Sequence, residues 1–521
     1  MVGPCVVSRE VVEDRLPKNF KDAMKCDDAE HWKEAINEEI NSLISNDVWD
    51  VVDRPKFDNI VGTKWVFGEK RDSDGEIERF KARLVAQGFS QIPGVDYTNT
   101  YSPVVTTRAW RILLALSAEN GWEINHIDVK TAYLNAPIDE TVYVEQPEGF
   151  VQGDRSFVCK LKKSLYGLHQ SAKNWFDILE RNLLSLGLKR CVTEPCVYFG
   201  EGFDLFLISY VDDLGIFGTK DKVRELKRKL EGLMRVSDKG EMSLFLSYQI
   251  TRRGDEIKID QSNFAAKVLK AFGQDNCRGL STPLPVKLDP SNDLIPFDKT
   301  KYRKAIGSLL YMSTGTRPDL AFAVSRQSQF CHVATEENWF EVRHILRYVK
   351  QTQNRSITYR KCGKPFEIYT DSDYANDASD RRSHGGYVVI LAGGVVSWSS
   401  RKQELVASSS TEAEFISMFE ASKEAKWMAN FLSEIEQHKF VLSPCKILAD
   451  NQPAIKLAGK IGFSYRTKHF DVKYLSLKGA VRKGKISFEY VATDKNPADM
   501  LTKVIPPVKI NLFCSMLGMK M

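Results

Sequence analysis

Two neighbouring acids interrupt a largely apolar stretch of the chain. The run LFLISYV (205–211) is followed by Asp212 and Asp213, and LGIF then resumes the apolar pattern. This pattern predicts a β-hairpin with carboxylates at its tip. Neighbouring carboxylates repel each other and need a partner cation. The alternative is an ordinary solvated Asp-Asp turn.

A third acid, Asp128, comes just after another apolar strand, Trp122 to Ile127. Three carboxylates at strand ends could bind two Mg²⁺ ions together with triphosphate oxygens, because Mg²⁺ takes few protein carboxylates and several substrate oxygens. Two such ions stabilise the attacking and leaving oxygens of a phosphoryl transfer. The three acids are therefore candidates for a phosphoryl-transfer site.

Four further acids lie at the ends of predicted elements in the C-terminal part of the chain. Asp371 and Asp450 each follow a strand, Asp499 lies near the start of a helix, and Glu414 lies in the first turn of a long helix. Taken singly, each acid is also typical of a cap or a turn.

The nearby Glu412 leaves one assignment open. Glu412 could complete a capping box with Ser409, and Glu414 could complete one with Thr411. Residues two apart on a helix face different ways, so only one of the two can join a site. Helix spacing does not choose between them.

The elements that must position these acids follow from periodicity. Residues 30–46 predict a helix, from about 60 to 260 β-rich runs alternate with helical ones, and residues 300–350 are helical. Residues 281–298, rich in Pro, Asp and Asn, predict a long connection. The apolar positions of the first helix are Trp32, Ala35, Ile36, Ile40, Leu43 and Ile44.

From about residue 364 a separate α/β unit is predicted, since its order of elements fits a compact mixed domain. Its elements are strand 366–374, a hairpin over 387–400 that turns at Gly393-Gly394, a long helix from about 411, strand 445–450, helix 451–459, strand 486–491 and a last helix near Pro497.

The composition is that of an ordinary globular protein. A chain of 521 residues suggests several domains, and a net charge of +6 permits a nucleic-acid partner without requiring one. The ten cysteines are scattered without zinc-site spacing. No apolar run reaches the roughly 18 residues of a membrane span. There is no Walker loop and no Gly-rich dinucleotide fingerprint.

The acids lie within longer motifs that resemble a known family. YVDD (210–213), preceded by DVKTAYL (128–134), resembles the palm of reverse transcriptases. The motifs GTKWVF, RFKARLVAQGFSQIPGVDY, TYSPVV, LKKSLYGLHQSAKNW and TRPDLAFAV resemble the polymerase region of copia-type LTR retrotransposons. The resemblance runs from about residue 17 to residue 503. It implies an α+β and α/β multidomain fold, with a right-hand polymerase followed by a connection and a ribonuclease H-like domain.

The resemblance implies that Asp128, Asp212 and Asp213 form the catalytic triad of the polymerase, with Asp128 and Asp212 as direct metal ligands. Tyr133 would be the steric gate that excludes a ribose 2′-OH, with simple packing as the alternative.

A nucleotide-binding group also follows from the resemblance: Lys81, Arg83, Tyr133, Tyr166 and Gly167. Lys81 and Arg83 match the fingers strand whose bases grip the triphosphate, where charge-assisted contacts make chemical sense. A solvated strand edge is the alternative, and the register between the two bases stays open. Tyr166 and Gly167 match the template-strand motif.

The motifs TDSD, SSTEAEF, ADNQPAI, SYRTKHFDVKY and NPADMLTK match the ribonuclease H motifs of the same family in order. By that match Asp371, Glu414, Asp450 and Asp499 bind the metal ions, and the choice of Glu414 over Glu412 rests on the resemblance alone. The loop VATDKNPAD lacks the histidine that many ribonucleases H carry before the last Asp.

Nucleic-acid contacts are implied for the primer-grip hairpin (Phe245, Leu246 and Tyr248) and for His469, which could equally be an ordinary surface residue. The chain departs from the usual family pattern at four positions. His169 replaces Lys, Ser247 replaces Gly, Tyr374 replaces Trp and Asn376 replaces Gly.

The predicted domains are an N-terminal extension (1–30), fingers and palm (31–260), thumb and connection helices (261–363), the ribonuclease H-like domain (364–503) and a tail (504–521). The implied cofactor is Mg²⁺, two ions per site, with Mn²⁺ as an alternative. The implied partners are RNA template, DNA primer, RNA–DNA hybrid, deoxynucleoside triphosphates and other retrotransposon proteins. A homodimer is one assembly that the resemblance allows, and no membrane partner is expected. The implied location is cytoplasmic, in virus-like particles, with nuclear entry.

The predicted function is RNA-directed DNA polymerase with ribonuclease H activity. A decayed or repurposed nucleic-acid-binding remnant is the alternative that the four departures motivate. An idle structural subunit is a third hypothesis. The chain would be either a processed polyprotein product or a truncated reading frame.

Overall fold

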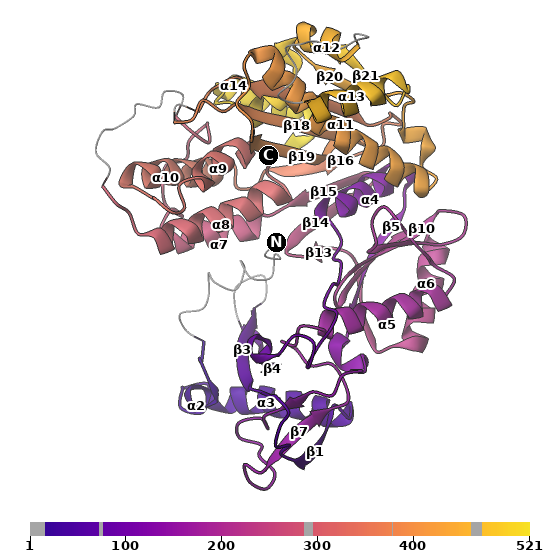
Figure 1. Cartoon of the computed structure of the whole chain (residues 1–521), viewed down its shortest axis with the longest axis vertical. Coiled ribbons are helices and arrows are strands. Elements are labelled where there is room, and N and C mark those ends of the chain that lie inside the picture. Colours follow the sequence, from indigo (N-terminus) through magenta and orange to yellow (C-terminus); the bar gives the residue numbers. More distant parts are fainter. Residues whose placement is uncertain (1–15, 72–76, 286–294, 378, 460–470) are drawn as a thin grey trace.

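The computed structural model describes residues 16–71, 77–285, 295–377, 379–459 and 471–521. Figure 1 shows a small β-rich unit with α3 at one end of the long axis and an α/β unit with α11 at the other. Between them lie the sheet that carries β5 and β10 and, beside it, the helices α7 to α10.

The N-terminal unit is built on α3 (Ala29–Ser45), as predicted. Trp32 packs edge-on against Phe67 and Phe80 of the β3–β4 ribbon, with ring centroids 5.2 and 4.6 Å apart. Ile44 was expected in the buried face but is 64% exposed, because at about 100° per residue it lies a full step around the helix from buried Leu43. The other elements are α2 (Phe20–Ala23), β1 (Trp49–Asp53), β2 (Ile60–Val61), β3 (Thr63–Arg71), β4 (Ile77–Ala86), β6 (Tyr143–Val144) and β7 (Phe157–Leu161).

An antiparallel sheet forms the centre of the molecule, in the order β12-β5-β11-β10-β9-β8. Its side chains alternate between two cores: Phe206 and Ile208 pack towards α4, and Leu207 packs towards α5 and α6. The elements are α4 (Thr107–Asn120), β5 (Glu123–Val129), α5 (Ser171–Ser185), β8 (Lys189–Arg190), β9 (Val197–Phe199), β10 (Leu205–Tyr210), β11 (Asp213–Gly218), α6 (Lys220–Leu233) and β12 (Val236–Glu241).

A second antiparallel sheet joins distant parts of the chain in the order β13-β14-β15-β16-β22. Its last strand comes from the very end of the chain and pairs with β16. The predicted helical segment over 300–350 is confirmed. The elements are β13 (Leu244–Phe245), β14 (Tyr248–Arg253), β15 (Glu256–Asp260), α7 (Ser262–Ala271), α8 (Lys299–Gly315), α9 (Ala321–Ser328), α10 (Glu336–Gln351), β16 (Ser356–Tyr359) and β22 (Met519–Lys520).

The C-terminal α/β unit contains a sheet in the order β19-β18-β17-β20-β21, with β20 parallel to both β17 and β21. The elements are β17 (Glu367–Asp373), β18 (His384–Leu391), β19 (Gly394–Lys402), α11 (Ser410–Glu434), β20 (Cys445–Ala449), α12 (Gln452–Gly459), α13 (Asp471–Arg482), β21 (Ile486–Tyr490), the 3-10 helix η8 (Pro497–Leu501) and α14 (Pro507–Met516).

Two predictions about this unit need correction. The hairpin turns at Ala392 and Gly393, whose φ angles are +52° and +69°, and not at Gly393-Gly394; Gly394 instead begins β19, where a Cβ would lie 2.7 Å from the backbone oxygen of Thr358. The last predicted helix, near Pro497, is only the short 3-10 helix η8, and a longer helix, α14, follows it.

The central sheet and the C-terminal unit share one continuous core. Buried Arg111 on α4 is one polar link between them. Its guanidinium donates to the backbone oxygens of Val396 at 2.7 Å and Gly315 at 2.6 Å and lies 4.0 Å from the ring centroid of Trp398. The two units are therefore fixed to each other through α4.

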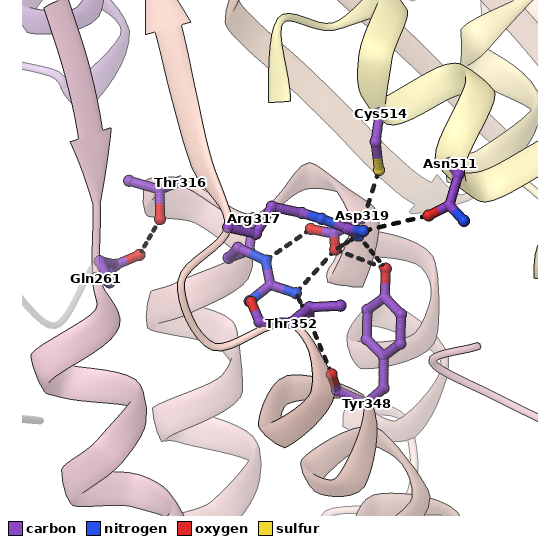
Figure 2. A network of polar contacts seen from close by, with 9 residues as sticks. Gln261, Thr316, Arg317, Asp319, Tyr348, Thr352, Asn511 and Cys514 are labelled. Carbon is purple, nitrogen blue, oxygen red and sulfur yellow. Dashed lines mark hydrogen bonds and ion pairs between the residues drawn. The ribbon is translucent and has the colours of Figure 1, made fainter. Parts of the chain in front are cut away.

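A buried ionic network ties the connection helices to the end of the chain (Figure 2). The Asp319 side chain is fully buried and binds Arg317 through two bonds of 2.9 and 2.8 Å, and Arg355 at 2.9 Å. Tyr348 donates to the same carboxylate at 2.8 Å. Arg355 also contacts Cys514 on α14 at 3.5 Å. The two arginines hold the pKa of Asp319 well below its usual range against the effect of burial.

Among the described residues, no helix combines the length and the apolar character that a membrane crossing needs.

Candidate active sites

The first acid group lies at one end of the central sheet. Asp128 and Asp213 are opposite each other in the β5–β11 register. Asp212 lies at the tip of the β10–β11 hairpin, beside Val211, whose φ is +57°. The indole nitrogen of Trp175 donates to the Val211 backbone oxygen at 2.7 Å and fixes this turn. The predicted hairpin with carboxylates at its tip is confirmed.

The charge at this tip favours a cation. Burial raises the pKa of Asp212 to about 6, and the neighbouring carboxylates Asp213 and Asp128 raise it further, while Arg83 opposes them. The ammonium of Lys239 lies 3.9 Å from the Asp128 carboxylate, too far for a hydrogen bond.

Asp213 differs from the other two acids because it already has a partner. Its Oδ1 lies 2.8 Å from Nε2 of His126, two residues before Asp128 on the same strand. The sequence analysis missed His126. The strand alternation that puts His126 and Asp128 on one face is the signal that could have found it.

Asp128 and Asp212 line a cleft of about 490 Å³. Lys81 and Arg83 on β4 line the same cleft, and residues two apart on a strand share a face. Which of the two bases binds the triphosphate stays a prediction. The Arg83 guanidinium lies 5.0 Å from the ring centroid of Tyr166. The predicted metal-binding acids and triphosphate-binding bases are thus brought together.

Tyr133 and Tyr166 pack edge to face, with ring centroids 4.6 Å apart. Neither residue is among those that line the cleft. The ring contact is what the packing interpretation of Tyr133 predicts, and the steric-gate role stays a prediction. Gly167 has φ +94°, and a Cβ there would lie 2.1 Å from the backbone oxygen of Ala86. Only glycine fits this close approach to the end of β4.

The predicted primer-grip hairpin is present as β13–β14. The sequence analysis expected Phe245 and Tyr248 to contact nucleic acid. Their side chains are instead only 1% and 3% exposed and belong to the core. They stack with Trp110 at 6.1 and 4.9 Å. In the turn, Leu246 and Ser247 have φ angles of +50° and +67°. Leu246 is partly buried against the core and Ser247 is exposed.

The second acid group assembles in the C-terminal unit. Carboxylate oxygens of Asp371, Asp450 and Asp499 lie within 4.8 Å of one another. Asp371 lies on β17 and Asp450 follows β20, and these two parallel strands pair side by side up to Thr370 and Ala449. Asp499 comes from η8.

Glu414 lies near enough to the second acid group to feel the charges of Asp371 and Asp450, whereas Glu412 is engaged at the helix cap. The Glu412 carboxylate accepts the backbone N–H of Ser408 at 2.8 Å, next to the N-cap of α11. Burial raises the pKa of Glu414 well above its usual value, and the charges of Asp371 and Asp450 raise it further. Its Oε2 is buried without a hydrogen-bond partner in the described structure.

Lys503 is the cation of the second group, and the sequence analysis missed it. Its ammonium lies 3.1 Å from Asp499 Oδ1 and 3.6 Å from Asp371 Oδ2. The spacing of four residues from Asp499 within NPADMLTK could have indicated it. Even with this lysine, burial and the charge of Asp371 raise the pKa of Asp499 to about 7.

These donors fit a divalent cation. Carboxylates of Asp371, Asp450 and Asp499 meet beside Lys503, and a buried carboxylate oxygen of nearby Glu414 lacks a partner in the described structure. Oxygen donors of this kind suit Mg²⁺ and Mn²⁺.

A cleft of about 1030 Å³ runs from the connection helices to this group and is lined by Lys503 and Asp373. Asn376, one of the departures from the family pattern, also lines it, and Tyr374 is exposed nearby. His469 lies outside the described residues. Basic residues along the cleft are Lys299, Arg326, Arg382 and Lys402.

Comparison with known proteins gives a consistent result. Residues 46–286 match the family described as "Reverse transcriptase (RNA-dependent DNA polymerase)". The Pol polyprotein from transposon TNT 1-94 of Nicotiana tabacum is 36% identical, over 98% of this chain and 39% of its own length. The Pol polyprotein from transposon RE1 of Arabidopsis thaliana is 35% identical, over 94% of this chain and 34% of its own length. The Ty1-GR2 Gag-Pol polyprotein of Saccharomyces cerevisiae is 26% identical, over 92% and 28%.

Solved structures share the fold at low identity. A foamy viral protease-reverse transcriptase in complex with ds DNA has a TM-score of 0.51 and 11% identity, covering 88% of this chain and 70% of that chain. The protease-reverse transcriptase in complex with RNA/DNA hybrid has a TM-score of 0.50 and 12% identity, covering 89% and 54%. The predicted fold class is confirmed: a polymerase followed by a connection and a ribonuclease H-like domain.

The chain contains a reverse transcriptase domain over residues 46–286. More particularly, it is a homologue of the Pol polyproteins of copia-type transposons over most of its length. It spans little more than a third of the plant relatives it matches.

Proposed function

We propose that the chain is an RNA-directed DNA polymerase with ribonuclease H activity. The observation that carries the proposal is the cleft in which Asp128 and Asp212 lie together with Lys81 and Arg83. Acids for cations and bases for a triphosphate are the two halves of a nucleotidyl-transfer site. The match of residues 46–286 to the reverse transcriptase family supports the same function.

In the polymerase site, Asp128 and Asp212 would hold divalent cations, and Lys81 and Arg83 would bind the triphosphate. Bound Mg²⁺, two ions per site, would stabilise the attacking 3′ oxygen and the departing pyrophosphate. Asp213, held by His126, would fix the hairpin tip without directly binding the metal.

In the ribonuclease H site, Asp371, Glu414, Asp450 and Asp499 would hold the cations at the end of the cleft beside the connection helices. The RNA strand of a hybrid would enter along this cleft, which is lined by both basic and acidic side chains. Phosphate contacts with its Lys and Arg residues would give sequence-independent binding. The solved relatives of this fold in complex with ds DNA and RNA/DNA hybrid support such a substrate.

The proposed substrates are an RNA template, a DNA primer and deoxynucleoside triphosphates, and the proposed product of the first site is the substrate of the second. Other proteins of the transposon are proposed partners, since the relatives are polyproteins. Mn²⁺ is expected to replace Mg²⁺ because both take oxygen ligands.

The test is primer extension on a labelled RNA template with deoxynucleotides and Mg²⁺, so that both reactions are seen at once. Extension with hybrid-dependent RNA cleavage is the expected result. Hybrid binding without either reaction would contradict the proposal and support a non-catalytic remnant.

A further inference from the structure

We infer that helix α3, which precedes the family match at residue 46, forms one wall of the nucleotide cleft, and that Glu39 on it is a positioning residue for Arg83. Four residues of α3 line the cleft: Ala35, Glu38, Glu39 and Ser42. The inference deepens the proposed polymerase function and rests on it.

Glu39 is attached to β4 at two points. Its Oε2 accepts a hydrogen bond from Arg83 Nη1 at 3.2 Å, and its Oε1 accepts the backbone N–H of Leu84 at 3.3 Å. The side chain is only 6% exposed. A carboxylate held by a backbone N–H has few alternative positions, so it gives Arg83 a fixed anchor.

Arg83 is held on a second side by an aromatic ring. Its guanidinium lies 5.0 Å from the ring centroid of Tyr166, which itself packs on Tyr133. The Arg83 side chain is 33% exposed and lines the cleft that Asp212 also lines. A guanidinium has five N–H donors in a rigid plane, so a contact through Nη1 orients the others. Glu39 and Tyr166 thus aim Arg83 at the space where a triphosphate would lie.

The neighbouring ion pair shows why burial matters. Glu38 and Arg79 also line the cleft and lie 2.5 Å apart, but their side chains are 61% and 58% exposed. Such exposed pairs contribute little, because solvent screens them and the side chains remain mobile. Glu39 is the acid of this helix that can hold a base in one orientation.

The experiment is single-nucleotide incorporation with Glu39→Gln, Arg83→Gln and the double variant. Glutamine keeps an acceptor for Leu84 but loses the charge that orients Arg83. We expect KM for the deoxynucleotide to rise about tenfold in Glu39→Gln, equivalent to about 1.4 kcal/mol, with a much smaller change in kcat. In the Arg83→Gln background the Glu39 substitution is expected to add nothing further.

The matched control is Glu30→Gln, on the same helix. Glu30 is exposed, pairs only with Lys33 among the contacts described, at 2.6 Å, and does not line the cleft. Thermal unfolding and primer–template affinity without nucleotide are measured for every variant. If Glu39→Gln lowers the unfolding temperature, Glu39→Asp, which keeps the charge, replaces it and is expected to give a smaller rise in KM.

The two possible failures are distinguishable. If the chain extends primers, two results would overturn this inference alone. One is an unchanged KM in Glu39→Gln. The other is an equal effect of the Glu39 substitution on KM with Arg83 present and with Arg83→Gln. A wild-type chain that extends no primer would overturn the polymerase function and this inference with it.

Discussion

In the first acid group, Asp212 and Asp213 are neighbours in the sequence at one hairpin turn, and Asp212 lines a cleft together with Asp128. In the second group, Asp371, Asp450 and Asp499 come from separate elements and gather within 4.8 Å. The first group has no lysine in hydrogen-bond range among the contacts described, whereas the second contains Lys503 at 3.1 Å.

The difference follows from how each group is buried. A hairpin tip needs only its own strands and an adjacent strand to hold it, so the acids can remain accessible to a bulky triphosphate. A site assembled from a sheet, a long helix and a 3-10 helix excludes more water, and its crowded carboxylates need a cation before any metal binds. We interpret Lys503 as the residue that stabilises the second group in the metal-free state.

The largest expected effect comes from breaking the buried ionic network around Asp319, which lies outside both acid groups. Asp319→Asn would leave Arg317 and Arg355 buried without their counter-charge, and breaking a buried ion pair in this way costs about 3–5 kcal/mol. The free energy of unfolding, measured by denaturant titration, should fall by this amount. Both activities should become thermally labile together, since the network joins the connection helices to the end of the chain.

The control for this prediction is Glu225→Gln, which removes an exposed contact with Lys229. The unfolding midpoint should not change. A stable Asp319→Asn protein would show that the ionic network does not hold the connection helices to the end of the chain.

We expect the metal affinities of the two acid groups to respond differently to acid pH. Burial raises the pKa of Asp499 to about 7 and that of Asp212 to about 6. Protons compete with metal ions for carboxylates, so as the pH falls the second group should lose metal affinity first, by up to about tenfold per pH unit for each proton displaced.

The measurement is calorimetric titration with Mn²⁺ above and below these pKa values. Asp212→Asn isolates the second group, and Asp450→Asn isolates the first. If Mn²⁺ affinity depends on pH equally in both variants, the proposed electrostatic difference between the two groups is wrong.

The smallest effect concerns only the polymerase region. Ser247 has φ +67° in the turn of the primer-grip hairpin, where glycine has no steric penalty. Ser247→Gly should raise the free energy of unfolding by about 1 kcal/mol, because relief of left-handed strain exceeds the entropy that glycine loses. Ser243, nearby and without a positive φ, is the control and should lose stability when changed to glycine. No gain in Ser247→Gly would mean that the turn carries no strain.

The sequence predicted those features that depend on local pattern. Two continuous apolar runs gave the β10–β11 hairpin and its acids. Apolar strand segments also located Asp450 directly after β20 and Asp371, which was expected after its strand but lies within β17. The choice of Glu414 needed the family resemblance, because helix spacing alone left Glu412 open. The structure then provides the physical reason: Glu412 is engaged at the helix cap by Ser408.

Contacts between distant segments could not be predicted in this way. His126 on β5 contacts Asp213 on the paired strand β11. Glu39 contacts Arg83 from a helix that contains none of the recognised motifs. The burial of Phe245 and Tyr248 depends on Trp110, which belongs to another element. Local patterns contain no information about which surfaces meet.

The central claim is that one chain contains two independent phosphoryl-transfer sites. The most direct test is the labelled-RNA primer-extension assay on wild type, Asp212→Asn and Asp450→Asn, with preformed hybrid added to follow cleavage separately. Asp212→Asn should lose DNA synthesis and keep RNA cleavage, and Asp450→Asn should do the reverse. Each loss should exceed the roughly 100-fold expected from removing an outer partner of a metal site. Synthesis that survives Asp212→Asn, or cleavage that survives Asp450→Asn, would contradict the account.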